Sequence, residues 1–237
     1  MSVEEVVMKY EAVNMFPSTV YIGEIEGHIE HKKVFYDKIY PEYDYPYDDM
    51  HTVSEEQGKP TIHTEESAAP MMMEITKHIK NFYLNVLGLK DIFDVYHTKT
   101  WLSRSRSGEG LIPTHIHSPS HISYVYYLNV PEGSPHLTFI DIKNVNEVFT
   151  SCFESYPDED TFMNGYTFES TKTYSIESTE GTICIFPSNR PHRTDPVSEV
   201  FSGERLAISG DCILALKEDE KMVYANGYTN PKYWRKY

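Results

Sequence analysis

The sequence has few cysteines, and their arrangement excludes two common kinds of site. Cys152, Cys184 and Cys212 are odd in number and widely spaced. This pattern predicts neither a disulfide framework, which needs pairs, nor a thiolate metal site, which needs closely spaced ligands. We therefore expect all three to be small buried residues.

Positive charge and long apolar runs are also scarce. The 21 Lys and Arg residues are outnumbered by 36 Asp and Glu residues, and the formal net charge is −15. This balance disfavours a nucleic-acid partner, because binding to a phosphate backbone needs a basic face. No apolar run reaches the roughly 20 residues that span a bilayer, and the charged first residues are unlike a signal peptide. We expect a cytoplasmic protein without a nucleic-acid or membrane partner.

The chain does have enough apolar residues for one sizeable core. Its 237 residues are 40% hydrophobic, which predicts a single domain over residues 1–237. We expect residues 1–91 to form a helical and loop support, residues 92–215 the core, and residues 216–237 a C-terminal tail.

One segment before the core has helical periodicity. Apolar residues recur at helical spacing in "TEESAAPMMMEITKHIKNFYLNVLGL", at Met72, Ile75, Ile79, Phe82 and Val86. This spacing predicts one amphipathic helix that ends at Gly88.

Two other segments show no regular period. The stretch "YDKIYPEYDYPYDDM", residues 36–50, alternates Tyr, Asp and Pro, and we expect a loop there. Residues 144–173 are acidic and irregular, and loops of that length often border functional sites.

Short strands are expected after residue 90. The stretches "FDVYHTKTWLS", "HISYVYYLNV", "PHLTFIDI", "TICIFPS" and "RLAISGDCIL" are rich in β-branched and aromatic residues and are bounded by turn formers. No helical segment separates them, so an antiparallel sandwich or barrel is favoured over a parallel α/β sheet.

Histidines gather at the start of one of these strands, in "PTHIHSPSHISYVYYLNVP". In an extended chain, His115 and His117 point to the same face, with Cα atoms roughly 6 to 7 Å apart. Two imidazoles on one face bind a metal ion if a third ligand arrives from a neighbouring strand. The candidate for that ligand is His192, in "GTICIFPSNRPHRTDP", just beyond another strand.

A charged residue also lies in a strand that is otherwise apolar. In "GERLAISGDCIL", one face carries Arg205, Ala207 and Ser209 in alternation. A guanidinium inside a barrel is costly unless it meets an anion, and its planar fork suits a carboxylate. The anion is either a ligand's carboxylate or a structural partner, Asp211 or Glu204.

The order His-x-His, distal His, then Arg-x-x-x-Ser resembles that of the 2-oxoglutarate and Fe(II)-dependent oxygenases. "HIHSPSHISYVYYLNV" is similar to the prolyl hydroxylase pattern, and "TWLSRSRSGEGLIPTHIHSPSHISYVYYLNVPEGSPHLTF" looks like a family of 2-oxoglutarate oxygenases of bacteria and phages. The resemblance covers roughly residues 101–214. It implies a mainly β (α+β) fold, a double-stranded β-helix or jelly roll of about eight strands, with N-terminal helices packed on one sheet.

The resemblance also implies roles for single residues. His115 would be the first iron ligand, His192 the distal ligand, and Arg205 the partner of the distal carboxylate of 2-oxoglutarate. Ser209 would assist Arg205, and Tyr127 falls where prolyl hydroxylases place a tyrosine that touches the co-substrate. Trp101 matches a family tryptophan, for which we expect core packing.

The sequence departs from the family at His117, where the usual metal triad has Asp or Glu. Three neutral imidazoles leave two positive charges on a ferrous site, whereas two imidazoles and a carboxylate leave one. Either His117 is the third ligand and Fe(II) is held less tightly before 2-oxoglutarate binds, or His117 stays off the metal and Asp141 or Asp195 supplies a carboxylate.

The resemblance therefore implies an enzyme with Fe(II) and 2-oxoglutarate as cofactors. It would be a dioxygenase, a hydroxylase that couples decarboxylation of 2-oxoglutarate to succinate with oxidation of a small-molecule or peptide substrate. We also allow for a homodimer. Two alternatives stay open: a cupin-like dioxygenase with a three-histidine iron site and no 2-oxoglutarate, and a non-catalytic jelly-roll binding or assembly protein.

Overall fold

A computed structural model describes residues 18–43, 52–53, 59–106, 112–141, 173–195, 201–218 and 228–236. Cys152 and residues 144–172 of the irregular acidic segment lie outside these ranges. The other two cysteines, Cys184 and Cys212, are buried free thiols, as expected. In the part of the chain that the structure describes, no helix is both long enough and apolar enough to cross a bilayer.

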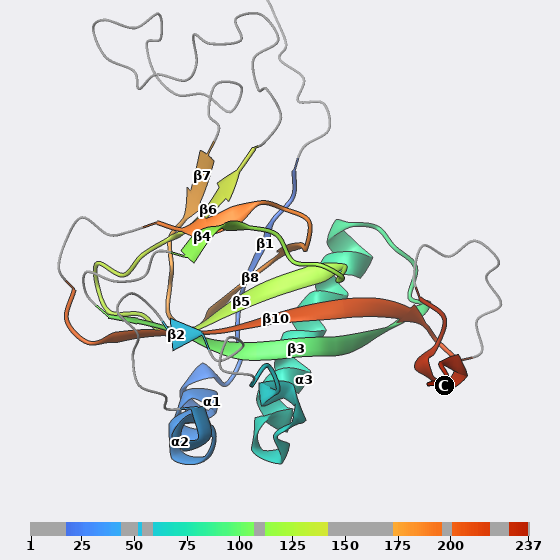
Figure 1. Ribbon diagram of the computed structural model, residues 1–237, viewed down its shortest axis with the longest axis horizontal. Coiled ribbons are helices and arrows are strands. Elements are labelled where there is room, and N and C mark those ends of the chain that lie inside the picture. Colours follow the sequence, from blue (N-terminus) through green and yellow to red (C-terminus); the bar gives the residue numbers. More distant parts are fainter. Residues whose placement is uncertain are drawn as a thin grey trace, which may run out of the picture.

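The strands form two antiparallel sheets. The larger sheet has the order β1-β8-β5-β10-β3-β2, and the smaller one has the order β4-β9-β6-β7 (Figure 1). The strands of the larger sheet are β1 (Tyr21–Glu24), β2 (Thr52–Val53), β3 (Phe93–Arg106), β5 (Ile122–Asn129), β8 (Thr182–Pro187) and β10 (Glu204–Leu216). Those of the smaller sheet are β4 (Ile112–His115), β6 (Leu137–Ile140), β7 (Thr173–Ile176) and β9 (His192–Thr194).

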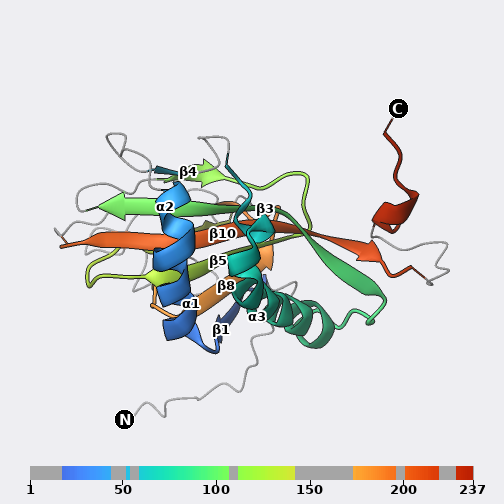
Figure 2. The same ribbon diagram turned by 90° about the horizontal axis from the view of Figure 1, so that it is seen from below.

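The helices precede the main run of strands and cover one face of the larger sheet (Figures 1 and 2). They are α1 (His28–Val34), α2 (Tyr40–Tyr43) and α3 (Ala69–Asn81), with π-helical turns at Phe35–Ile39 and Phe82–Val86 and 3₁₀ turns at Ile62–Thr64 and Glu66–Ala68. A further 3₁₀ turn, Pro231–Tyr233, follows β10. The expected fold class is confirmed: the chain is mainly β, with two antiparallel sheets and helices packed on one of them. The described residues from Phe93 to Leu216 contain eight strands, β3 to β10.

The predicted amphipathic helix is confirmed as α3 and the π-helical turn that follows it. Met72, Ile75, Ile79 and Phe82 are buried against the sheet, as their spacing predicts. Val86 is 45% exposed, because it lies at the end of the π-helical turn, where the helix runs out beyond the sheet. Gly88 then adopts a positive φ of 68°, a conformation that favours glycine and ends the helix.

The prediction of a loop at residues 36–50 is wrong for its first part. Residues up to Tyr43 are helical, and residues 44–50 lie outside the described ranges. The reason is a spacing of four that begins one residue before the segment: Phe35, Ile39 and Tyr43 are all buried, with exposures of 0%, 2% and 1%. This apolar stripe fixes the helix on the sheet despite the neighbouring polar residues.

Alternation along the central strands separates two cores. In β5, Tyr124, Tyr126 and Leu128 belong to the core shared with the helices, whereas Val125 and Tyr127 belong to the core between the two sheets. Successive strand residues point to opposite faces, so each central strand serves both cores. The inner core is the one that borders the functional site.

Candidate metal centre

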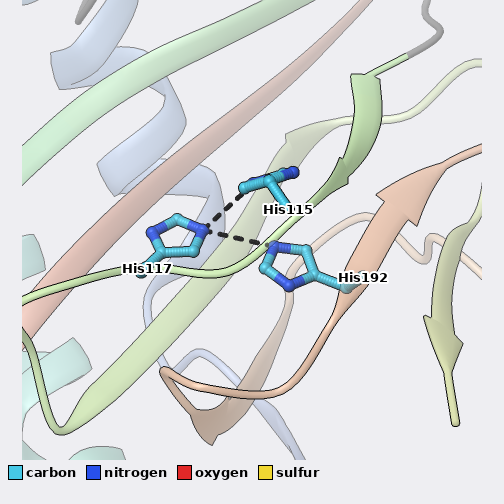
Figure 3. A group of neighbouring side chains, drawn as sticks. All are labelled: His115, His117 and His192. Atoms are coloured by element: carbon cyan, nitrogen blue, oxygen red, sulfur yellow. Dashed lines mark hydrogen bonds between the residues drawn. The ribbon is translucent and has the colours of Figure 1, made fainter. Parts of the chain in front are cut away.

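Three histidines converge where the smaller sheet meets the turn into β5. His115 ends β4 and His192 begins β9, and the two are directly paired across the antiparallel ladder. His117 lies two residues further on, where its backbone N–H donates to the Ser188 carbonyl at 2.9 Å. Figure 3 shows the three rings pointing toward one another. The structure therefore brings together all three histidines named from the sequence.

The facing atoms are the three Nε2 nitrogens. His117 Nε2 lies 3.2 Å from His115 Nε2 and 3.2 Å from His192 Nε2. Two nitrogens bound at right angles to a metal about 2.1 Å away lie about 3 Å apart, so this spacing suits one first-row transition metal. Among the described residues, these three histidines form the one group whose ligand atoms lie close enough together to hold a metal ion.

The other ring nitrogens determine which protons the site holds. His115 Nδ1 is 2.8 Å from the Pro113 carbonyl oxygen, and His192 Nδ1 is 2.9 Å from the Arg190 carbonyl oxygen. A carbonyl oxygen only accepts, so each Nδ1 donates a proton, and each Nε2 of the neutral ring has a free lone pair.

His117 Nδ1 lies 2.8 Å from Asp211 Oδ1 and donates to it, so His117 Nε2 also carries a free lone pair. The contacts drawn as dashed lines in Figure 3 therefore join acceptor to acceptor, unless one ring carries a second proton. A second proton is unfavourable on His192, because burial, with smaller contributions from His115 and His117, lowers its pKa to about 3. Converging lone pairs of this kind are stabilised by a bound cation. The donor set thus fits a metal ion such as Fe(II).

The two carboxylates considered as alternatives to His117 are placed elsewhere. Asp141 is exposed. Asp195 accepts hydrogen bonds from Arg193 Nε and Thr138 Oγ1, both at 2.5 Å. Neither residue belongs to the converging group. His117 is therefore the better candidate for the third ligand.

A cavity of about 530 Å³ opens beside the triad. Its lining includes all three histidines and four alternate residues of β10, which are Arg205, Ala207, Ser209 and Asp211. The period of two predicted from the sequence thus directs this face of β10 into the cavity that contains the histidines.

Arg205 presents a guanidinium to this cavity with little to neutralise it. The side chain is 4% exposed, and its Nη2 donates to Ser178 Oγ at a long 3.5 Å. Its Nε has no hydrogen-bond partner among the described residues, and burial lowers the pKa of the guanidinium. A buried cation of this kind is costly unless an anion meets it.

The two structural partners considered for Arg205 make ion pairs with other residues. Glu204 lies 3.3 Å from Arg104 Nη2, and Asp211 Oδ1 lies 2.8 Å from His117 Nδ1. No carboxylate forms an ion pair with Arg205 in the part of the chain that the structure describes. The described residues therefore favour a carboxylate brought by a ligand.

Tyr127 lies against this guanidinium, beneath the cavity surface. Its ring centroid is 5.3 Å from Arg205 Cζ, and the residue is fully buried. Within the described residues, its hydroxyl has no hydrogen bond of good geometry. Burial raises the pKa of this hydroxyl well above its usual value, so it stays protonated and can donate to an anion.

Two site residues were not recognised as such from the sequence. Trp101 is buried, as core packing predicts, but its ring also stacks on His117 with centroids 5.4 Å apart and lines the cavity. Asp211 was considered only as a partner for Arg205. The alternation that identified Arg205, Ala207 and Ser209 would have found it, because Asp211 is the next residue on the same face.

Comparison with known proteins agrees with this geometry. Residues 99–211, which include the three histidines and Arg205, match a family model described as "Putative 2OG-Fe(II) oxygenase". This match confirms the expected resemblance, and the family implies Fe(II) and 2-oxoglutarate as cofactors. No curated protein matches the chain by sequence.

Two solved structures are among those to which the chain is similar, both at low sequence identity. A prolyl-4-hydroxylase of Pseudomonas putida is 12% identical, with a TM-score of 0.48 over 82% of this chain and 92% of that one. An oxidoreductase of the 2OG-Fe(II) oxygenase family from Burkholderia pseudomallei is 10% identical, with a TM-score of 0.41 over 62% of this chain and 56% of that one.

Proposed function

We propose that the protein is an Fe(II)- and 2-oxoglutarate-dependent dioxygenase that hydroxylates a small-molecule or peptide substrate. The observation that carries this proposal is that one cavity contains both a converging triad of imidazole lone pairs and a buried guanidinium without a carboxylate partner. The match of residues 99–211 to the oxygenase family supports it.

Each residue of the site would have a separate role. His115, His117 and His192 would hold Fe(II) through Nε2, each fixed by an acceptor at its Nδ1. The guanidinium of Arg205 would bind the distal carboxylate of 2-oxoglutarate, and the hydroxyls of Ser209 and Tyr127 would orient it. Trp101, stacked on His117, would restrict the rotation of that ring.

When bound, Fe(II) would activate dioxygen for the oxidative decarboxylation of 2-oxoglutarate. The overall reaction balances as 2-oxoglutarate, dioxygen and a substrate C–H giving succinate, carbon dioxide and a substrate C–OH. The apolar residues around the triad, including Phe186 and Leu137, would exclude bulk water from the cavity.

Succinate formation without a prime substrate tests the proposal. Purified protein is incubated with Fe(II), 2-oxoglutarate and air, and succinate and oxygen are measured. Slow succinate release that requires both Fe(II) and 2-oxoglutarate is the expected result, because these oxygenases turn over slowly in the uncoupled reaction. Metal binding without any effect of 2-oxoglutarate would favour the three-histidine dioxygenase. Absence of metal binding would favour a non-catalytic jelly-roll protein.

Three expectations stay predictions. They are a single domain whose parts meet at residues 91 and 215, the homodimer, and the substrate class.

For the substrate, one observation is relevant. A second cavity of about 410 Å³ shares Lys99, Ser118 and Asp211 with the first and is also lined by Tyr228 and Trp234. A substrate that reaches the triad from this side would meet an aromatic wall.

A further inference from the structure

We propose that Asp211 positions His117 and supplies, from behind that ligand, the negative charge that a three-histidine site lacks. The inference rests on the metal-binding part of the proposed function and does not depend on 2-oxoglutarate. It assigns a role to a residue outside the triad, through its contact with His117.

The contact between the two side chains is direct and sheltered. His117 Nδ1 lies 2.8 Å from Asp211 Oδ1, and Asp211 is 3% exposed. Figure 3 shows that one nitrogen of His117 faces the other two rings while its second nitrogen lies on the far side. Since a carboxylate oxygen accepts, Nδ1 donates to Asp211, and Nε2 is left to face the metal position.

Asp211 is itself held in place by hydroxyl groups. Ser123 Oγ lies 2.7 Å from the same Oδ1 and 2.8 Å from Ser188 Oγ. A hydroxyl has one proton, so donation by Ser123 to the carboxylate leaves Ser188 to donate to Ser123. The resulting chain runs from Ser188 through Ser123 and Asp211 to His117, and its hydrogen bonds converge on the carboxylate.

The backbone around Asp211 is shaped for this contact. The ladder between β10 and β3 shifts register between Asp211 and Cys212, which leaves Thr98 as an extra residue on β3. The Thr98 hydroxyl donates to the Asp211 carbonyl at 3.1 Å. Such irregularities re-aim a side chain next to a site, and this one lies beside the triad.

Gly210 leaves room on the opposite side of the strand. A Cβ at this position would lie 2.3 Å from the Tyr124 hydroxyl, so any larger residue would push that ring and the strand apart. The glycine thus lets β10 lie close to the Tyr124 ring at the residue before Asp211.

The charge of Asp211 would compensate for the histidine at position 117, which stands where the usual triad has a carboxylate. Two imidazoles and a carboxylate leave one net positive charge on a ferrous site, and three imidazoles leave two. A charged Asp211 restores the usual total without binding the metal. A carboxylate behind a metal-binding histidine also raises the basicity of that ligand and fixes its orientation.

The test is divalent-metal affinity of the apoprotein without co-substrate. Co(II) is titrated into wild type and Asp211→Asn, with the visible absorption bands as the signal and a chelator as competitor. Asparagine keeps the shape and can still accept from Nδ1, but it removes the charge. We expect Asp211→Asn to weaken Co(II) binding about 10–100-fold and to shift the absorption bands, since the ligand becomes less basic.

Asp195→Asn is the matched control, because it removes one negative charge three residues after His192 without touching a triad ring. Its Co(II) affinity and spectrum should equal those of wild type. If Asp211→Asn binds Co(II) within threefold of wild type and with the same bands, the inference is overturned. If wild type itself binds no metal, the proposed function fails first.

A second pair of variants separates charge from position. His117→Asp alone places two carboxylates side by side. His117→Asp combined with Asp211→Asn leaves one carboxylate, at a position where it would bind the metal directly. The double variant should bind Co(II) more tightly than Asp211→Asn alone. Equal or weaker binding by the double variant would show that Asp211 acts by shape only, and would overturn the charge role.

Ser123→Ala keeps the Asp211 carboxylate and removes one of its hydrogen bonds. It therefore provides a test of the proposal even if Asp211→Asn does not fold. A loss of metal affinity of only a few fold is expected. A loss of a hundredfold from Ser123→Ala would mean that placement, rather than charge, decides metal binding, and would overturn the proposal as stated.

Discussion

The two faces of the larger sheet bury different kinds of side chain from the same strands. On β10, Leu206 and Ile208 face the helices and belong to a mainly apolar layer. The residues that alternate with them, Arg205, Ser209 and Asp211, face the inner cavity. The outer face gains free energy by burying apolar area, whereas the inner face buries a cation and an anion at a cost. The difference indicates that the outer layer stabilises the fold, whereas the inner layer is arranged to bind charged ligands.

The largest expected effect is the loss of metal binding when a histidine of the inner layer is replaced. His115→Ala or His192→Ala should each abolish stoichiometric Fe(II) binding, a loss of more than about a hundredfold, since even residues that only orient a ligand contribute about 10–100-fold. Circular dichroism should show the wild-type fold, because the apolar outer layer is untouched. Fe(II) titration under anaerobic conditions measures this. His31→Ala, on α1, is the control, and wild-type iron affinity in either triad variant would contradict the assignment.

A substitution in the outer layer should lower stability and leave metal binding unchanged. Ile208 is fully buried between the sheet and the helices, and Ile208→Ala should lower the free energy of unfolding by about 2–5 kcal/mol. Metal affinity of the folded variant should not change, because the side chain points away from the cavity. Denaturant unfolding and Co(II) titration measure the two effects. A large loss of metal affinity would show that the layers are coupled rather than separate.

Removal of the buried cation should affect the co-substrate and spare the metal. Arg205→Ala should weaken 2-oxoglutarate binding about a hundredfold, because a bidentate charge-assisted pair in a sheltered site is lost. Arg205→Lys keeps the charge but loses the planar fork, so it should recover only part of the affinity. Calorimetry with a redox-inert divalent metal measures this ranking. Arg106→Ala removes an exposed arginine and should have no effect.

A smaller effect concerns pH and the outer layer. His97 lies among Thr76, Tyr124 and Cys212, and burial, with a smaller contribution from His63, lowers its pKa from 6.5 to about 4. Between these values the unfolded chain binds a proton that the folded chain does not. The stability that His97 contributes is therefore complete above pH 6.5 and is lost as the pH falls toward 4.

At pH 5 this loss amounts to about 2 kcal/mol relative to pH 7. Denaturant unfolding of the apoprotein at both pH values, compared between wild type and His97→Gln, isolates the contribution from those of other buried histidines. An identical pH dependence in the two proteins would show that His97 does not contribute to it.

The smallest effect is expected at Ser209. Ser209→Ala removes one neutral hydroxyl from the cavity lining and should cost about 1 kcal/mol in 2-oxoglutarate binding. Calorimetry under the conditions used for Arg205 measures it. An effect as large as that of Arg205→Ala would mean that the hydroxyl, rather than the guanidinium, selects the ligand.

Short-range patterns in the sequence predicted α3 and five of the strands, β3, β5, β6, β8 and β10. The spacing of Ile75, Ile79 and Phe82 predicts α3, and alternation in "RLAISGDCIL" predicts β10 with Arg205 and Ser209 on one face. The helix at residues 35–43 is not predicted, because its apolar stripe begins at Phe35, just before the stretch whose Tyr, Asp and Pro content is typical of a loop.

By itself the sequence determined α3, the two faces of the central strands, and a set of ligand types that includes three histidines and one arginine. These depend on residues a few positions apart, where the period of a helix or strand sets the geometry. Tertiary structure alone decided that His117, rather than Asp141 or Asp195, lies beside His115 and His192, and that Asp211 lies behind it. Those choices depend on which strands pair and in which register, and His117 and Asp211 are 94 residues apart in the chain (211 − 117). No local pattern encodes a contact across that separation, because it forms only when β5, β9 and β10 are packed together.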